Sequence, residues 1–136
     1  MFETFEHTAD LGLHITADTA EQLFEQAGRG LLSIIVENLD DVEGGESRSI
    51  HLDGELEAYL LFDWLNELLY LFDSQQFVAS QFRVRLTEQG LDATVTGGPL
   101  NPQRHRLDHE VKAITYHDLS LEQVKTGWEA RVIVDI

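Results

Sequence analysis

The 136-residue chain contains no cysteine, two prolines and few basic residues. The lack of cysteine excludes a disulfide framework, a thiol nucleophile and a thiolate zinc site, and it favours a cytoplasmic location. Nine Lys and Arg stand against 25 Asp and Glu, a formal net charge of −16, which argues against direct binding to nucleic acid or to an anionic membrane. The same charge suits a partner with a basic surface or a site that collects divalent cations.

Long apolar runs and several familiar enzyme motifs are also absent. The most apolar stretch, residues 59–72, is too short to span a bilayer and contains Asp63, Asn66 and Glu67. The first six residues lack the basic start and apolar run of a signal peptide. Without a G-x-S-x-G elbow, a P-loop or a glycine-rich dinucleotide fingerprint, a self-contained NTPase or dinucleotide enzyme is disfavoured. With 43% hydrophobic residues, the sequence predicts one soluble globular domain over residues 1–136.

The apolar periodicity of helices occurs twice, at about residues 19–37 and at about residues 54–73. Asp18 or Thr19 can cap the first helix, and Asp53 can cap the second. Gly28 and Gly30 inside the first helix cost about 1 kcal/mol each relative to alanine, which indicates close packing against a neighbouring backbone. The second helix is apolar around most of its circumference and is predicted to be the central core helix.

Alternation of apolar and polar residues predicts the strands. They are expected at residues 3–7, 11–15, 48–52, 82–86, 91–95, 109–117 and 128–134, with an added edge strand at 120–125. A turn at residues 88–90 makes a hairpin, and glycine and proline place a loop at residues 97–102. The sequence therefore predicts an α+β fold in which mixed, largely antiparallel sheets pack on the two helices.

Asp10 lies where the first strand region turns into the second, after His7, Thr8 and Ala9. An aspartate at such a junction can point a hard oxygen ligand outward, or its side chain can satisfy the amides of a turn. The His7 side chain is expected to be hydrogen-bonded and partly buried rather than a ligand. The pattern leaves both interpretations of Asp10 open.

Asp135 and the α-carboxylate of Ile136 place two anions next to each other at the end of a predicted strand. The ends of domains usually fray, so a strand that continues to the last residue needs something to hold it. A divalent cation such as Ca²⁺ takes this kind of oxygen set and would relieve the repulsion. The alternative is a solvated, mobile tail.

Lys112 lies in the predicted strand at residues 109–117, on the same face as Ile114 and Tyr116. It is either an edge charge that discourages aggregation or a functional ammonium beside a carboxylate cluster. The histidines at positions 105, 109 and 117 do not have a zinc-site spacing, and a zinc site is set aside.

Four blocks of sequence, in order and at the right distances, resemble the archease family, which assists RtcB-type RNA ligases in tRNA splicing and RNA repair. The blocks are His7-Thr8-Ala9-Asp10-Leu11-Gly12, the second-helix run from Leu60 to Leu69, the run from Val111 to His117, and Val134-Asp135-Ile136. The resemblance covers the whole chain.

The resemblance implies an activator, not an enzyme, which promotes guanylylation and multiple turnover of a ligase that joins RNA ends. It implies that Asp10 and Asp135 bind a divalent metal, with the terminus of Ile136 as a further oxygen donor, and that Lys112 is the essential basic residue. Calcium is the expected metal, with manganese or magnesium as alternatives. The partner would be an RtcB-type RNA ligase, and the protein is expected to work as a monomer without binding RNA itself.

Two other functions stay open. The first is a stand-alone, metal-dependent phosphohydrolase in which a cation on the same acids polarises a phosphoryl oxygen or activates water. The second is a chaperone-like modulator of RNA-modifying enzymes, with the acidic surface as its active feature.

Overall fold

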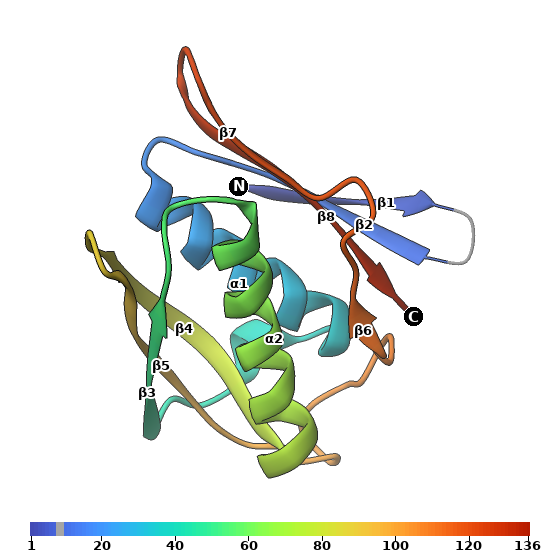
Figure 1. Cartoon of the computed structure of the whole chain (residues 1–136). Helices are drawn as coiled ribbons and strands as arrows, with labels where there is room; N and C mark the ends of the chain where they lie inside the picture. Colours follow the sequence, from blue (N-terminus) through green and yellow to red (C-terminus); the bar gives the residue numbers. More distant parts are fainter. Residues whose placement is uncertain (8–9) are drawn as a thin grey trace.

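The computed structural model describes residues 1–7 and 10–136 (Figure 1). The junction at Thr8 and Ala9, and the predicted hydrogen bonding of the His7 side chain, lie outside this description. The described elements are β1 (Phe2–His7), β2 (Asp10–Ala17), α1 (Ala20–Ile35), the 3-10 helix η1 (Leu39–Asp41), β3 (Glu46–Asp53), α2 (Ala58–Gln75), β4 (Phe77–Leu86), β5 (Gly90–Pro99), β6 (Ala113–Ile114), β7 (Ser120–Val124) and β8 (Gly127–Asp135).

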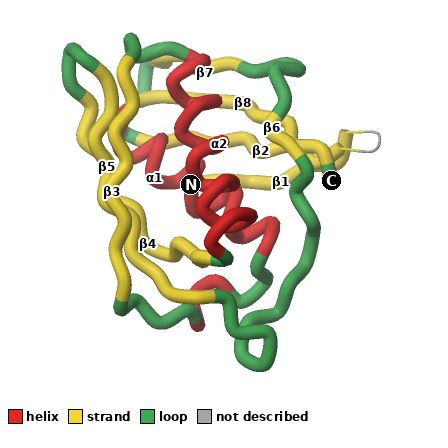
Figure 2. Tube along the Cα trace, turned by 60° about the horizontal axis from the view of Figure 1, so that its bottom comes forward, coloured by secondary structure: helices red, strands yellow, loops and turns green. Residues whose placement is uncertain are grey.

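The strands form two sheets, and the two helices lie between them (Figures 1 and 2). One sheet has the order β1-β2-β8-β6, with β7 also paired to β8, and the other has the order β3-β5-β4. Every strand pair that the structure describes is antiparallel. The α+β prediction is confirmed, and the sheets are antiparallel rather than mixed.

Helix α1 begins where the sequence predicts. The Thr19 hydroxyl caps it by accepting a hydrogen bond of 3.1 Å from the backbone N–H of Gln22. A side chain at Gly28 would lie about 3.0 Å from Leu68, and one at Gly30 would lie 2.9 Å from Leu13. The expected close packing at both glycines is therefore correct, but the neighbours are side chains rather than a backbone.

Helix α2 begins at Ala58, four residues later than predicted, and Asp53 does not cap it. Asp53 is instead the last residue of β3 and pairs with Gly90 of β5. The hydrogen-bonded ladder between these strands continues through Asp53. Asp53 therefore belongs to the sheet and does not cap the helix. None of the described helices is long and apolar enough to cross a membrane.

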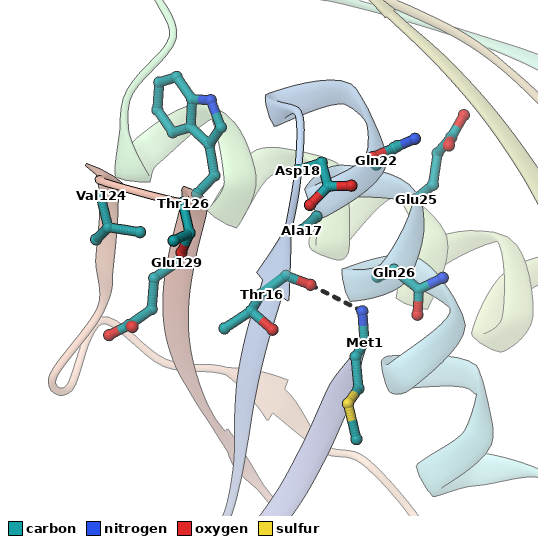
Figure 3. Close-up of a pocket in the computed structure, with 11 residues that line it drawn as sticks. Met1, Thr16, Ala17, Asp18, Gln22, Glu25, Gln26, Val124, Thr126 and Glu129 are labelled. Carbon is teal, nitrogen blue, oxygen red and sulfur yellow. Dashed lines mark hydrogen bonds between the residues drawn. The ribbon is translucent and has the colours of Figure 1, made fainter.

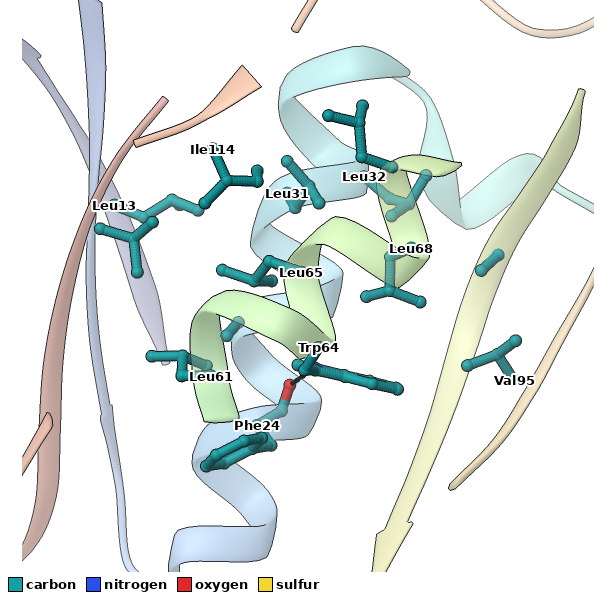
Figure 4. Close-up of a cluster of buried hydrophobic side chains, with 14 of the residues drawn as sticks. Leu13, Phe24, Leu31, Leu32, Leu61, Trp64, Leu65, Leu68, Val95 and Ile114 are labelled. Atoms are coloured by element: carbon teal, nitrogen blue, oxygen red, sulfur yellow. Dashed lines mark hydrogen bonds between the residues drawn. The ribbon is translucent and has the colours of Figure 1, made fainter. Parts of the chain in front are cut away.

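Trp64 of α2 lies at the centre of the core (Figure 4). Its indole N–H donates a 2.8 Å hydrogen bond to the backbone carbonyl of Phe24 in α1, and its ring meets Phe82 of β4 edge-on at 6.4 Å. A buried indole needs such an acceptor, because an unpaired polar group in the core is costly. The interaction fixes α2 on α1, as expected for the central core helix.

Two strand predictions need correction. The predicted loop at residues 97–102 is wrong over its first three residues, because β5 runs to Pro99 and pairs there with the start of β4. Gly97 passes so close to the Val78 carbonyl that a side chain would not fit. The start of β4 is buried on both faces, so it lacks the alternation that the sequence pattern detects.

The strand predicted at residues 109–117 is limited to Ala113 and Ile114. Upstream, the backbone N–H groups of Asp108 and His109 donate to the carbonyls of Ile35 and Ile34. The segment therefore satisfies the open carbonyls at the end of α1 before it reaches the sheet. Ile114 is buried, whereas the flanking Lys112 and Tyr116, outside the short strand, are exposed.

The outer face of the five-stranded sheet carries a ring packed on a glycine. Phe5 of β1 pairs with Gly12 of β2, and its ring lies where a side chain at Gly12 would be. The Arg131 guanidinium lies 4.8 Å from the centre of the same ring. The absence of a side chain at Gly12 therefore makes room for the end of the Phe5 ring.

Gly12→Ala is expected to lower the free energy of unfolding by about 1–3 kcal/mol, because the new methyl group must displace the Phe5 ring. Urea denaturation measures the change. Gly45→Ala is the matched control, since no atom lies within 4 Å of a side chain added there. Equal stabilities of the two variants would contradict this account of Gly12.

Candidate functional site

The site predicted from the sequence is built on three neighbouring strands. Asp10 of β2 pairs directly with Asp135 of β8, and Asp135 pairs on its other side with Ala113 of β6. Cross-strand partners point their side chains to the same face, with Cβ atoms about 4.5–5.5 Å apart. Two aspartates that are 125 positions apart in the sequence therefore project side by side from one end of the sheet.

These aspartates lie on the outer face of the sheet. Alternate residues of β2 and β8, among them Leu13 and Val134, are buried in the core. Since successive side chains of a strand point to opposite faces, Asp10 and Asp135 leave the sheet on the side away from the core. Both are partly buried, and they follow Gly12 and its covering Phe5 ring along this face.

The end of the chain is held in the sheet. Strand β8 pairs with β2 over eight residues on one side and with β6 and β7 on the other. Ile136 is partly buried and packs against the core. The strand at Asp135 is therefore an internal strand, not a solvated tail, and the terminal carboxylate follows directly after it.

Lys112 contacts Asp135 through a backbone hydrogen bond. Its N–H donates a 2.7 Å hydrogen bond to the carbonyl of Asp135. Its side chain is exposed and makes no hydrogen bond or ion pair with the described residues. The structure thus brings Lys112 next to Asp135 in the backbone and leaves the ammonium group open to a partner.

The acids form no ion pair with the described side chains, although Lys112 is their neighbour in the backbone. No ion pair within 4.0 Å forms at Asp10, at Asp135 or at the terminal carboxylate. No group of three or more described His, Asp or Glu side chains lies close enough together to hold a metal ion. Two side-chain carboxylates and one terminal carboxylate fit the oxygen chemistry of a hard cation. Ca²⁺ takes 6–8 oxygens, so carboxylates that bind through one oxygen each would leave positions for water or a partner.

The model of the archease protein family (MTH1598/TM1083) matches residues 2–136. The chain belongs to the archease family. Among curated relatives, protein archease of Pyrococcus abyssi is 39% identical, with 99% of this chain and 98% of that protein covered. Protein archease of Methanosarcina mazei is 36% identical, with 99% and 95% covered. The resemblance to the archease family is confirmed.

Solved archease structures share the fold. The solution structure of Methanobacterium thermoautotrophicum protein 1598 matches with a TM-score of 0.84 at 31% identity, over 99% of this chain and 98% of that chain. The 2.0 Å crystal structure of an archease from Thermotoga maritima (TM1083), described as a possible chaperone, matches with a TM-score of 0.71 at 24% identity, over 100% and 98%. The second likeness concerns the fold alone.

A cavity of about 650 Å³ lies at the other end of the β2–β8 pair in this archease (Figure 3). It is lined by Met1, Asp18, Glu25 and Glu129 among others, and the Met1 ammonium donates a 2.8 Å hydrogen bond to the carbonyl of Thr16. The length of β2, about 23 Å by strand geometry, separates this cavity from Asp10. The cavity is therefore not part of the carboxylate site.

The sequence reasoning missed a histidine held between two acids on the three-stranded sheet. The two ring nitrogens of His51 lie 2.7 Å from an oxygen of Asp92 and 2.9 Å from an oxygen of Asp53. The hydrogen bond to Asp92, followed by the one to Asp53, raises the pKa of His51 above 6.5. His51 and Asp53 follow each other at i and i+2 on one face of a strand, a spacing that indicates such a pair.

Because the folded pKa of His51 is raised, its contribution to stability is present below pH 6.5 and is lost as the pH rises through the folded pKa. His51→Gln is therefore expected to destabilise the protein more at about pH 5 than at about pH 9. Urea denaturation at both pH values measures the difference, and NMR titration of the imidazole reports its pKa. Asp92→Asn should lower that pKa, and an imidazole that titrates as in a model peptide would contradict the geometry.

Proposed function

We propose that this archease-family protein activates an RtcB-type RNA ligase by direct contact, promoting guanylylation and multiple turnover of the ligase. The observation that carries the proposal is the pairing of Asp10 with Asp135, with the Lys112 backbone bonded to Asp135. In the ligase-activating role, the acids and the Ile136 terminus hold a divalent cation and the exposed Lys112 ammonium meets the partner. Calcium is the first choice of metal, with manganese or magnesium as alternatives.

The open character of the site supports an accessory role. The carboxylates lie on an outer face of the sheet rather than in a closed cavity, and among the described residues no three His, Asp or Glu side chains are close enough to enclose a cation. A site that is completed by a partner suits an activator better than a stand-alone phosphohydrolase. The net charge of −16 also suits docking beside a basic, RNA-binding surface without competition for the RNA.

A chaperone-like role is the second candidate. One solved archease carries the description of a possible chaperone. An activator acts on one partner at a defined site, whereas a chaperone-like protein stabilises several clients. Stabilisation of unrelated client enzymes, unaffected by changes at Asp135, would favour this second function.

Lys112→Ala and Asp135→Ala are expected to abolish stimulation of a cognate RtcB-type ligase in a multiple-turnover ligation assay, while the fold is retained. The ammonium and the cation would act at the partner, so their loss removes the effect without disturbing the core. Lys125→Ala, at the other lysine of the chain and also exposed, is the matched control and should stimulate like the wild type. Normal stimulation by Lys112→Ala and Asp135→Ala would refute the site.

Phosphate-ester hydrolysis by the protein alone that depends on Asp135 would instead support the phosphohydrolase function.

Calcium is expected to stabilise the wild type and not Asp10→Asn or Asp135→Asn. A ligand at ten times its Kd stabilises the folded state by about 1.4 kcal/mol, which raises the Tm of a domain of this size by about 3–6 °C. Differential scanning calorimetry with and without calcium measures the shift, and manganese and magnesium are compared in the same way. Glu122→Gln on β7 is an exposed control, and an equal calcium shift in all four proteins would place the ion elsewhere.

A further inference from the structure

The three tyrosines of the chain are all exposed, and they gather on and beside α2. Tyr59, Tyr70 and Tyr116 are 60%, 61% and 60% exposed. Tyr59 and Tyr70 are eleven residues apart in α2, which is three turns, so they lie on one stripe of the helix about 16 Å apart. Large exposed aromatic side chains that gather in this way are typical of a surface that binds another molecule.

One end of the stripe is a rigid aromatic cluster. Tyr116 stacks on Phe62 of α2 with ring centres 4.1 Å apart and an interplanar angle of 17°. It also meets Tyr59 edge-on at 5.6 Å. The neighbouring Thr115 is fixed to β8 by two 2.9 Å hydrogen bonds to the carbonyl of Ile133. The cluster therefore joins α2 to the segment after the edge strand β6, which pairs with β8 at Asp135.

The same side of α2 is acidic. Asp63, Glu67 and Asp73 lie between or beside the tyrosines, and α2 contains no lysine or arginine. None of these three acids forms an ion pair with the described residues. Partial burial, followed by the charge of Glu110, raises the pKa of Asp73. Asp73 and Glu110 thus bring like charges together beside a cavity of about 360 Å³, whose lining also includes His109.

None of the other helices and strands that the structure describes covers the outer side of α2, which faces the viewer in Figure 1 and stays uncovered in Figure 2. We propose that the α2 face, formed by Tyr59, Phe62, Asp63, Glu67, Tyr70, Asp73 and Tyr116, is the docking surface for an arginine-bearing surface of the partner protein. Guanidinium groups stack on aromatic rings and pair with carboxylates, so arginine matches both features of this face. The inference rests on the proposed function and names where the ligase is held.

Three molecules could occupy the α2 face, namely a second copy of this chain, RNA or a basic protein, and their charges distinguish them. A second copy of this chain would bring the same acidic face and the same net charge of −16, and RNA would bring phosphates, so both are repelled. A basic protein surface is attracted, and tyrosine and arginine are, with tryptophan, enriched among the residues that contribute most to the affinity of protein interfaces. Since Tyr116 follows β6, docking here places the partner beside Lys112 and Asp135.

The test measures the Kd of the cognate RtcB-type ligase for four variants by isothermal titration calorimetry. The double variants Tyr59→Ala/Tyr70→Ala and Asp63→Lys/Glu67→Lys are expected to weaken binding by about tenfold or more. Glu88→Lys/Glu122→Lys makes the same change of charge at exposed positions of a turn and of β7, and should bind like the wild type. Asp135→Asn, in the proposed metal site, should fail to stimulate the ligase whatever its affinity.

The outcomes separate the two proposals. If wild type stimulates the ligase but both α2-face variants keep its affinity, the docking surface is refuted and the proposed function stands. If the wild type neither binds nor stimulates the ligase, both fail. If sedimentation shows a wild-type dimer that the Tyr59→Ala/Tyr70→Ala variant abolishes, a second copy occupies the face and the inference is overturned. Circular dichroism confirms the fold of each variant, and the charge-reversal pair keeps the test decisive if the tyrosine pair unfolds.

Discussion

The antiparallel ladder between β2 and β8 is the constraint on which the rest of this structure depends. It aligns eight residue pairs, from Asp10 with Asp135 to Ala17 with Trp128. The same ladder turns Leu13 toward the helices and turns the two aspartates away from them. A slip by one residue would expose the buried side chains of one strand and separate the carboxylates, so the packing of the core fixes the geometry of the site.

The two functional surfaces proposed here meet at one edge of the molecule. Strand β6 pairs with the end of β8, and the residues that follow it carry Tyr116 onto α2. A partner that covers the aromatic stripe would therefore lie next to an open set of carboxylates and an exposed lysine. In the proposed role, the partner would supply the chemistry and could add ligands to the metal ion.

The predicted parts of the fold share a physical basis. Both helices, the hairpin of β4 and β5 and the cap at Thr19 depend on interactions between residues that are close in sequence. The predicted cap at Asp53 and the predicted strand at residues 109–117 were wrong because the backbone there bonds to residues far away in the sequence. Asp53 pairs with β5, and the N–H groups of residues 108–109 donate to carbonyls at the end of α1. Backbone groups take whichever partner the tertiary structure supplies, and local pattern does not reveal it.

The sequence by itself determined the type of domain, the absence of thiol chemistry, the acidity and the family, because composition and motif order are local properties. Its pattern also raised Asp10, Asp135 and Lys112 as candidates with alternatives left open, and the family resemblance implied their roles. Only the tertiary structure decided that Asp10 faces Asp135 and that Tyr116 stacks on Phe62. The physical reason is that strand pairing and ring packing join residues far apart in the chain, and burial of a shared core, not the local pattern, chooses those partners.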